Sequence, residues 1–172
     1  LGVIWSNEEG LRKKLIEDDK IQKSIEEGIE KEEDIKKIGS CVLVIAIASE
    51  EVAREIVNRI NIDALLLKIG KEVDVENIGW CVGCIVLANK EVGLKLVGSV
   101  LPKIEKEEDL EKIGVCVRDI ACESEEVGLK LVDSVASKIE KEEDIGKIRL
   151  CMWLITGASK KVAREMVNRL NP

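Results

Sequence analysis

The sequence repeats itself, and this repeat limits the possible folds more than any other feature. The string EKEEDI or EKEEDL begins at Glu30, Glu105 and Glu140, and a degenerate copy, GKEVDV, begins at Gly70. Aligning the copies places one cysteine of each in a common column: Cys41, Cys81, Cys116 and Cys151. The spacings are 40, 35 and 35 residues, because the first copy carries five extra residues around 61–65. A period of this length is typical of repeat arrays, in which each unit buries its apolar face against its neighbours.

We therefore expect one continuous domain of four repeats that follows a divergent partial unit. The predicted boundaries are 1–29 for the partial unit and 30–69, 70–104, 105–139 and 140–172 for the repeats. Residues 1–6 (LGVIWS) read as the end of a helix whose beginning is missing. The sequence does not begin with Met, so we expect it to be a piece of a larger protein.

The first half of each repeat has the apolar spacing of a helix. Counted from Ile35, the shared apolar positions fall at offsets 0, 3, 6, 7 and 10, which form one helical stripe, whereas a strand would keep even offsets. The stretch 41–48 (CVLVIAIA) resembles a buried strand, but its counterpart 116–123 (CVRDIACE) carries Arg118 and Asp119 at its centre. A β/α-repeat enzyme of unknown class is therefore the alternative hypothesis, ranked below a helical repeat protein.

The second half of each repeat predicts another helix. It opens with a residue suited to an N-cap, and these residues are Ser49, Asn89, Ser124 and Ser159. From Val52, the shared apolar positions fall at offsets 0, 1, 4, 5 and 8, again one helical face, and Pro102 and Pro172 fall at or beyond the expected helix ends. Each repeat should thus hold a first helix, one capping residue and a second helix. The predicted fold is all-α, an α-solenoid of stacked two-helix repeats of about 35 residues.

The shared pattern D-[IL]-x-x-I-G-x-C-V-x-x-I-x-x-A-[SN]-[EK]-[EK]-V-[AG] resembles the armadillo/HEAT class of helical repeats. It is similar in particular to degenerate repeats of uncharacterised archaeal proteins. The resemblance covers residues 30–172 and implies a scaffold that binds a protein or peptide. The pattern departs from the class in its short period and in lacking a third helix. Tetratricopeptide units would need Tyr or Phe, which are absent, and RNA-binding pentatricopeptide units should be basic, whereas this chain has a net charge of −7.

Composition excludes several functions. Without histidine the chain has no Ser-His-Asp triad, Cys-His dyad or imidazole metal site, and it has no phosphate-binding glycine motif. The acidic charge argues against nucleic acid and anionic membranes as partners. The longest apolar run, about eleven residues at 78–88, falls short of the roughly eighteen needed to span a bilayer, and no leader opens the chain. We expect a cytoplasmic protein that is not an enzyme and needs no cofactor.

The cysteines leave two hypotheses open. The common column lies on the buried stripe of the first helix, where a small apolar side chain suits close helix packing. Alternatively, Cys81 and Cys84 form a C-x-x-C pair that binds a metal or acts in redox chemistry. Stacked helices lie about 8–10 Å apart, which is wide for thiolates that share one zinc ion. Packing is therefore favoured over the metal or redox role.

A candidate partner-binding surface lies where the repeats differ. On the outer face of the second helix, opposite the apolar stripe, the middle repeats carry leucine followed by lysine where the outer repeats carry arginine followed by glutamate. The predicted binding residues are Arg54, Leu94, Lys95, Leu129, Lys130 and Arg164. Two aligned leucines on a solvent face, with basic residues around them, indicate an interaction patch.

Two further expectations concern the ends of the chain and its stability. The last second helix has no following unit, so self-association is expected through uncapped ends that include Val162, Met166, Val167 and Leu170. Lys and Glu are abundant and Gln occurs once, a composition that leans toward a thermophilic source.

Overall fold

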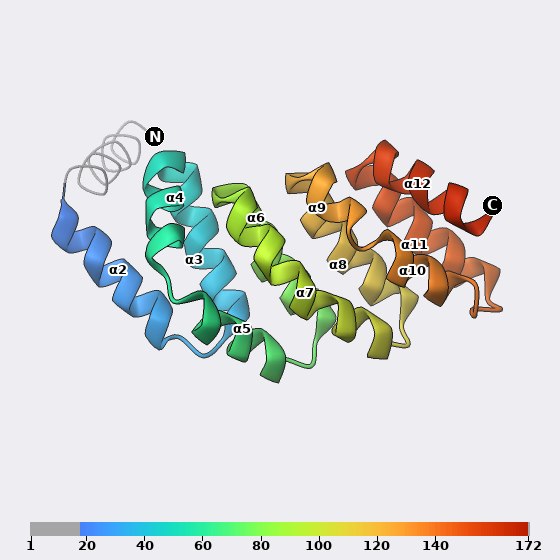
Figure 1. Ribbon diagram of the computed structural model, residues 1–172, viewed down its shortest axis with the longest axis horizontal. Helices are drawn as coiled ribbons and strands as arrows, with labels where there is room; N and C mark the ends of the chain where they lie inside the picture. The colour runs from blue at the N-terminus through green and yellow to red at the C-terminus, as the bar shows by residue number, and fades with distance from the viewer. Residues whose placement is uncertain (1–17, 172) are drawn as a thin grey trace, which may run out of the picture.

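The computed structural model describes residues 18–171, which form helices joined by short connections (Figure 1). No strand occurs among the described residues, so the all-α prediction is confirmed there, and the β/α reading of 41–48 and 116–123 is wrong. The predicted helix end at 1–6 lies outside the described residues. The helices are α2 (Asp19–Lys31), α3 (Ile35–Ala48), α4 (Glu50–Arg59), α5 (Ile62–Lys71), α6 (Val75–Ala88), α7 (Lys90–Lys106), α8 (Leu110–Glu123), α9 (Glu125–Leu129), α10 (Val132–Ile139), α11 (Ile145–Ala158) and α12 (Lys160–Leu170).

Each first helix begins directly after the aspartate that closes the repeated EKEED string. That aspartate is the N-cap, and its carboxylate accepts hydrogen bonds from backbone N–H groups of the first turn, as Asp34 Oδ1 does from Lys36 N at 3.0 Å. The other N-caps of this kind are Asp74, Asp109 and Asp144. The repeated acidic string therefore marks helix starts, where side-chain oxygens satisfy backbone donors that have no partner inside the helix.

A single residue joins the first helix of each repeat to the second. Ser49 is both the C-cap of α3 and the N-cap of α4, and its hydroxyl oxygen accepts a hydrogen bond from Val52 N at 3.3 Å. The same position is held in later repeats by Asn89, Ser124 and Ser159. All four predicted N-caps are confirmed. The extended residue turns the chain back, so α4 packs on α3, α7 on α6, α9 on α8 and α12 on α11.

The helices lie in two rows that follow the chain from one end of the molecule to the other (Figure 1). In one row, α6 packs between α3 and α8, and α11 packs on the far side of α8. In the other row, α5 contacts α7, α7 contacts α9 and α10, and α12 contacts both α9 and α10. The core lies between the rows, where Ile78, Val82 and Ile85 of α6 are fully buried. The sequence of α6 is apolar on almost all sides, and neighbouring helices cover it on several of them.

The second helices are less regular than the sequence predicts. In the first repeat the five extra residues begin a separate helix, because Asn61 caps α5 through a hydrogen bond from Ala64 N to its side chain at 3.0 Å. In the third repeat the second helix is interrupted between α9 and α10. Pro102 lies inside α7 rather than at its end, so that prediction is wrong. Proline has no backbone N–H, so Pro102 cannot donate to the carbonyl four residues earlier, that of the exposed Gly98.

No helix in the described part of the chain combines the length and the apolar character that crossing a bilayer requires.

Candidate functional site

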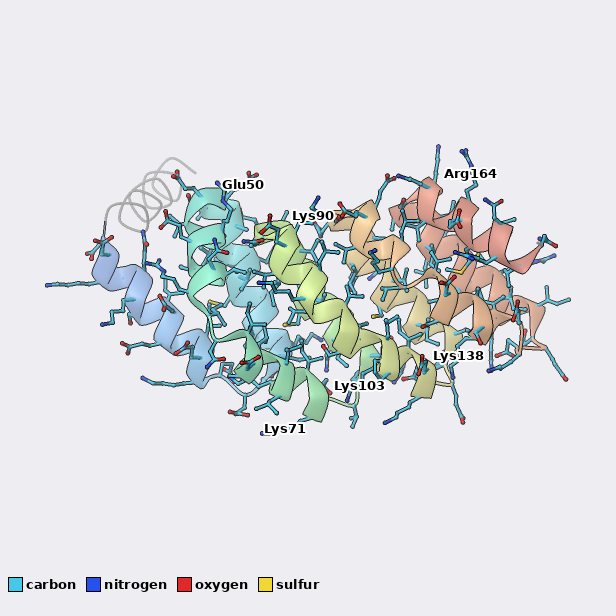
Figure 2. All side chains as sticks on the ribbon, in the orientation of Figure 1. Glu50, Lys71, Lys90, Lys103, Lys138 and Arg164 are labelled. Carbon is cyan, nitrogen blue, oxygen red and sulfur yellow. The ribbon has the colours of Figure 1, made fainter. Side chains whose placement is uncertain are left out.

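The six predicted binding residues lie on the second helices. Arg54 is on α4, Leu94 and Lys95 are on α7, Leu129 ends α9, Lys130 follows it, and Arg164 is on α12. The four basic side chains are exposed, as predicted. Figure 2 shows Arg164 pointing away from the body of the molecule. The surface therefore presents four positive charges along a row of helices, next to exposed carboxylates such as Glu91 and Glu126.

The two leucines are not the exposed patch that the sequence predicts. Leu94 and Leu129 are half-buried and pack against the core. The reason is tertiary, because both leucines pack against the core, on helices that contact a neighbouring second helix: α7 contacts α9, and α9 contacts α12. What remains accessible is the edge of each leucine, next to an exposed lysine. An apolar floor flanked by ammonium groups can hold a segment that carries both apolar and acidic side chains.

Side-chain contacts join neighbouring repeats along one edge of this surface. Asn89 Nδ2 donates to Asn58 Oδ1 at 2.7 Å, and Lys90 Nζ lies 2.7 Å from Glu126 Oε2. The hydrogen bond and charge of Glu126 raise the pKa of Lys90, and those of Lys90 lower the pKa of Glu126. Both groups stay charged at neutral pH, so this edge is a row of polar contacts between repeats. Such contacts align the helices and supply neither a nucleophile nor a general base.

Sequence reasoning missed a column of lysines that connects the second helices. Lys68 Nζ donates to the backbone oxygens of Glu30 and Glu32, at 2.6 and 2.7 Å, at the C-terminal end of α2. Lys103 Nζ makes the same pair of contacts at the end of α5, to the backbone oxygens of Gly70 and Glu72. These carbonyls lack partners inside their own helices, and a cation there also complements the helix dipole.

A sequence signal for this column exists. A lysine stands two residues before the repeated acidic string in three of the four copies, at Lys68, Lys103 and Lys138, whereas the first copy has Gly28. Of these three lysines, Lys68 and Lys103 bridge to backbone carbonyls in the described part of the chain. Figure 2 shows Lys103 and Lys138 along the lower edge of the molecule. Because lysines are common on helix surfaces, the alignment alone did not distinguish a buried bridge from a solvated charge. The 8% exposure of Lys68 makes that distinction.

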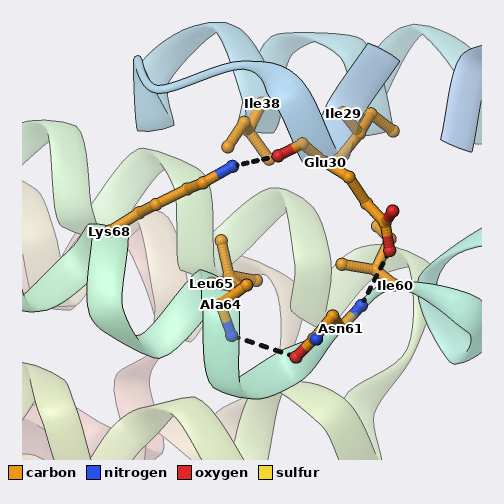
Figure 3. A pocket seen from close by; sticks show the side chains of 8 residues that line it. All are labelled: Ile29, Glu30, Ile38, Ile60, Asn61, Ala64, Leu65 and Lys68. Atoms are coloured by element: carbon orange, nitrogen blue, oxygen red, sulfur yellow. Dashed lines mark hydrogen bonds between the residues drawn. The ribbon is translucent and has the colours of Figure 1, made fainter. Parts of the chain in front are cut away.

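A small pocket lies where α2, α3 and α5 meet (Figure 3). Its walls are mostly apolar, and the Lys68 ammonium bonded to the Glu30 carbonyl closes one side. Its empty volume, open solvent included, is about 210 Å³. Cofactor and drug-sized ligands occupy pockets of roughly 300–1,000 Å³. The hollow is therefore too small for a cofactor.

The cysteine column serves close packing between first helices. A Cβ added to Gly79 would lie 2.5 Å from the Cα of Cys116, and one added to Gly39 would lie 2.8 Å from the Cα of Cys81. The same contact joins Gly114 to Cys151, at 3.1 Å. Each glycine lets the next helix approach closely, and the cysteine is the small side chain at that approach.

The pair Cys81 and Cys84 gains no support as a metal or redox site. Burial raises the pKa of both thiols to about 12, and each carries its proton at neutral pH. A protonated thiol is a poor nucleophile, so burial disfavours redox chemistry at this pair. Among the described residues, no group of three or more Cys, Asp or Glu side chains is arranged to hold a metal ion.

Comparison with protein-family models, curated proteins and solved structures finds no match to this chain. A functional proposal must therefore be argued from the contacts and charges of its own residues.

Proposed function

We propose that the chain is a non-enzymatic scaffold, an α-solenoid of the armadillo/HEAT kind that binds a protein or peptide along its second helices. The proposal is supported by the burial of equivalent residues, because residues of one repeat column have similar exposed fractions in successive repeats. Ile38, Ile78 and Ile113 are each at most 1% exposed. An array of this kind offers a long surface built from adjacent helices, and such surfaces commonly bind extended segments.

The observation that carries the proposal is the arrangement of charge around the half-buried leucines. Lys95 and Lys130 are exposed on neighbouring repeats, each next to a leucine that packs on the core. Arg54 and Arg164 are exposed one repeat further out on either side. The partner that fits is an extended or helical segment with apolar anchors at its centre and an acidic residue near either end.

Charge reversal tests the proposal without disturbing the core. We expect Lys95→Glu with Lys130→Glu to leave the fold intact, since exposed substitutions usually change stability by under about 0.5 kcal/mol. A photo-crosslinker at position 98, on the same exposed side of α7, should capture partners when Lys95 and Lys130 are present. It should not capture them in the double variant. The crosslinked peptides should contain acidic residues within a few positions of an apolar one.

The matched control reverses two exposed lysines elsewhere, Lys36→Glu with Lys141→Glu, which changes the net charge by the same amount. Capture should survive in the control. Equal loss in both double variants would show a general charge effect, and equal capture by all three proteins would place binding outside this surface.

A further inference from the structure

The second helices of the second and third repeats share almost the same sequence but differ in shape. Residues 91–106 form one unbroken stretch of α7, whereas the equivalent stretch 126–141 is divided into α9 and α10, with a break at Lys130 and Leu131 (Figure 1). The two stretches differ at three positions, where Gly98, Leu101 and Pro102 are replaced by Asp133, Ala136 and Ser137. Each replacement raises the helix propensity. The residues of the third repeat therefore favour an unbroken helix, and the break has a tertiary cause.

The third repeat has tighter turns than an α-helix at both ends of α10. Leu131 N donates to Gly128 O, three residues earlier, at 3.1 Å. After α10, Glu142 N donates to Ile139 O, again three residues earlier, at 3.2 Å. The counterpart of Glu142 at the end of α7 is Glu107, whose N–H donates to the oxygen four residues earlier. Hydrogen bonds over three residues form 3₁₀ turns, and such a turn inside a helix often marks a hinge.

The lysine bridge of the second repeat is also missing from the third. Lys103 of α7 donates to two backbone oxygens at the end of α5. Lys138 of α10 stands at the same position of its repeat, and α10 contacts α7. Within residues 18–171, however, the Lys138 ammonium makes no hydrogen bond or ion pair. The oxygens at the positions equivalent to the Lys103 acceptors are those of Glu105 and Glu107, at the end of α7.

Contacts with α12 account for the break. This helix packs on both α9 and α10. Val162 and Met166 of α12, predicted to lie on an uncapped end, are instead fully buried, so α12 is held firmly in place. Arg169 Nε of α12 lies 3.1 Å from Asp133 Oδ1, directly after the break. The second repeat has Gly98 at the position of Asp133, so α7 cannot form this ion pair.

We propose that residues 127–142, the switch segment, exchange between two backbone states. In the interrupted state, which the structure describes, Asp133 pairs with Arg169 and Lys138 is unbridged. In the continuous state the switch segment has the form of α7, and Lys138 donates to the backbone oxygens at the end of that helix. The exchange trades one exposed ion pair for one lysine bridge, and because an exposed ion pair is weak, the two states lie close in free energy.

The switch is a property of the fold and does not depend on a partner. One consequence alone rests on the proposed function. Lys130, a residue of the proposed binding surface, lies at the break. A partner that binds one state more tightly would therefore shift the population toward that state.

NMR relaxation dispersion on the protein without a partner tests the proposal, because helix rearrangements occur in microseconds to milliseconds. Residues 130–132 of the wild type should exchange with a minor state. The second repeat supplies the reference, since residues 95–97 have the same three residue types in an unbroken helix. The Cα chemical shifts of the minor state should match those of residues 95–97.

Two variants should move the population in opposite directions. Arg169→Ala removes the ion pair and should raise the ratio of the continuous to the interrupted state about fivefold, the factor that a strong exposed ion pair gives. Lys138→Met removes the bridge and should lower this ratio. The control Arg164→Ala removes another exposed arginine of α12 and should leave it unchanged. Circular dichroism checks that each variant is folded.

Four results would overturn the proposal. They are a flat dispersion profile at residues 130–132, a minor state with the shifts of an unfolded chain, wild-type shifts that already match those of residues 95–97, and a ratio that neither Arg169→Ala nor Lys138→Met changes. Because no partner is present, each result is independent of the crosslinking test of the second-helix surface.

Discussion

The close contact between α6 and α8 predicts that Gly79→Ala destabilises the protein, although alanine is the better helix former. Alanine in a helix interior favours folding by about 1 kcal/mol relative to glycine. At position 79 the new methyl would lie 2.5 Å from the Cα of Cys116, which is backbone and cannot rotate away. The two helices must separate by close to 1 Å to restore ordinary contact.

That separation sets the size of the effect. A gap of 0.5–1 Å removes roughly a quarter to a half of the dispersion energy of the atoms it parts, and overpacked cores lose about 1–3 kcal/mol. Gly79 makes the closest of the three contacts to the cysteine column, so its overpacking loss falls in the upper part of that range, about 2–3 kcal/mol. After the gain of about 1 kcal/mol in helix propensity is subtracted, we expect a net loss of about 1–2 kcal/mol in the free energy of unfolding. Gly114→Ala should cost less, since its nearest backbone atom is 3.1 Å away, and Gly39→Ala should fall between the two.

Gly98→Ala is the matched control. Gly98 lies in α7, is exposed, and has no atom within 4 Å of an added Cβ. The same substitution should stabilise the protein there by about 0.5–1 kcal/mol. Urea unfolding followed by circular dichroism measures all four variants. The reasoning is refuted if Gly79→Ala is as stable as wild type, or if Gly98→Ala loses as much stability as Gly79→Ala.

Three further predictions follow from the contacts. Replacing Lys68 with Met leaves two carbonyls at the end of α2 without their donor and should lower the free energy of unfolding by about 1–3 kcal/mol. Amide hydrogen exchange should become faster at that end of α2. Unchanged exchange would show that water replaces the ammonium. In native protein a thiol reagent should modify the exposed Cys122 well before Cys81 and Cys84, as peptide mass spectrometry would show. Burial raises the pKa of the Cys81 thiol from 9.0 to about 12, so between these pH values the folded state keeps a proton that the unfolded state loses. The contribution of this thiol to the free energy of unfolding is therefore complete below about pH 9 and declines as the pH rises toward 12. Unfolding midpoints of wild type and Cys81→Ala at pH 7.5 and 10 test this. Finally, the composition predicts a thermal midpoint above the mesophile range of about 45–65 °C, and calorimetry showing a midpoint inside it would contradict that prediction.

The sequence alone predicted the helices because their signals are local. Capping contacts reach only two or three residues along the chain, as from Asp34 to Lys36, so the residue types that make them can be read in order. The apolar offsets separated a helix from a strand even at 41–48, where composition favours a strand. The repeated cysteine column also indicated packing, although not which residue it packs against.

Tertiary structure decided how much of each side chain is covered, because burial depends on a neighbour far along the chain. Position 94 is predicted to face solvent from its own helix, yet the leucine is half-buried and packs against the core. Lys68 appears in the sequence as another surface lysine, but it reaches 36 and 38 residues back to Glu32 and Glu30. Ile145 and Ile35 share a column and a side chain, and one is 65% and the other 1% exposed. The sequence specifies which faces are apolar, and only the stacking of the helices determines which of those faces remain open to a partner.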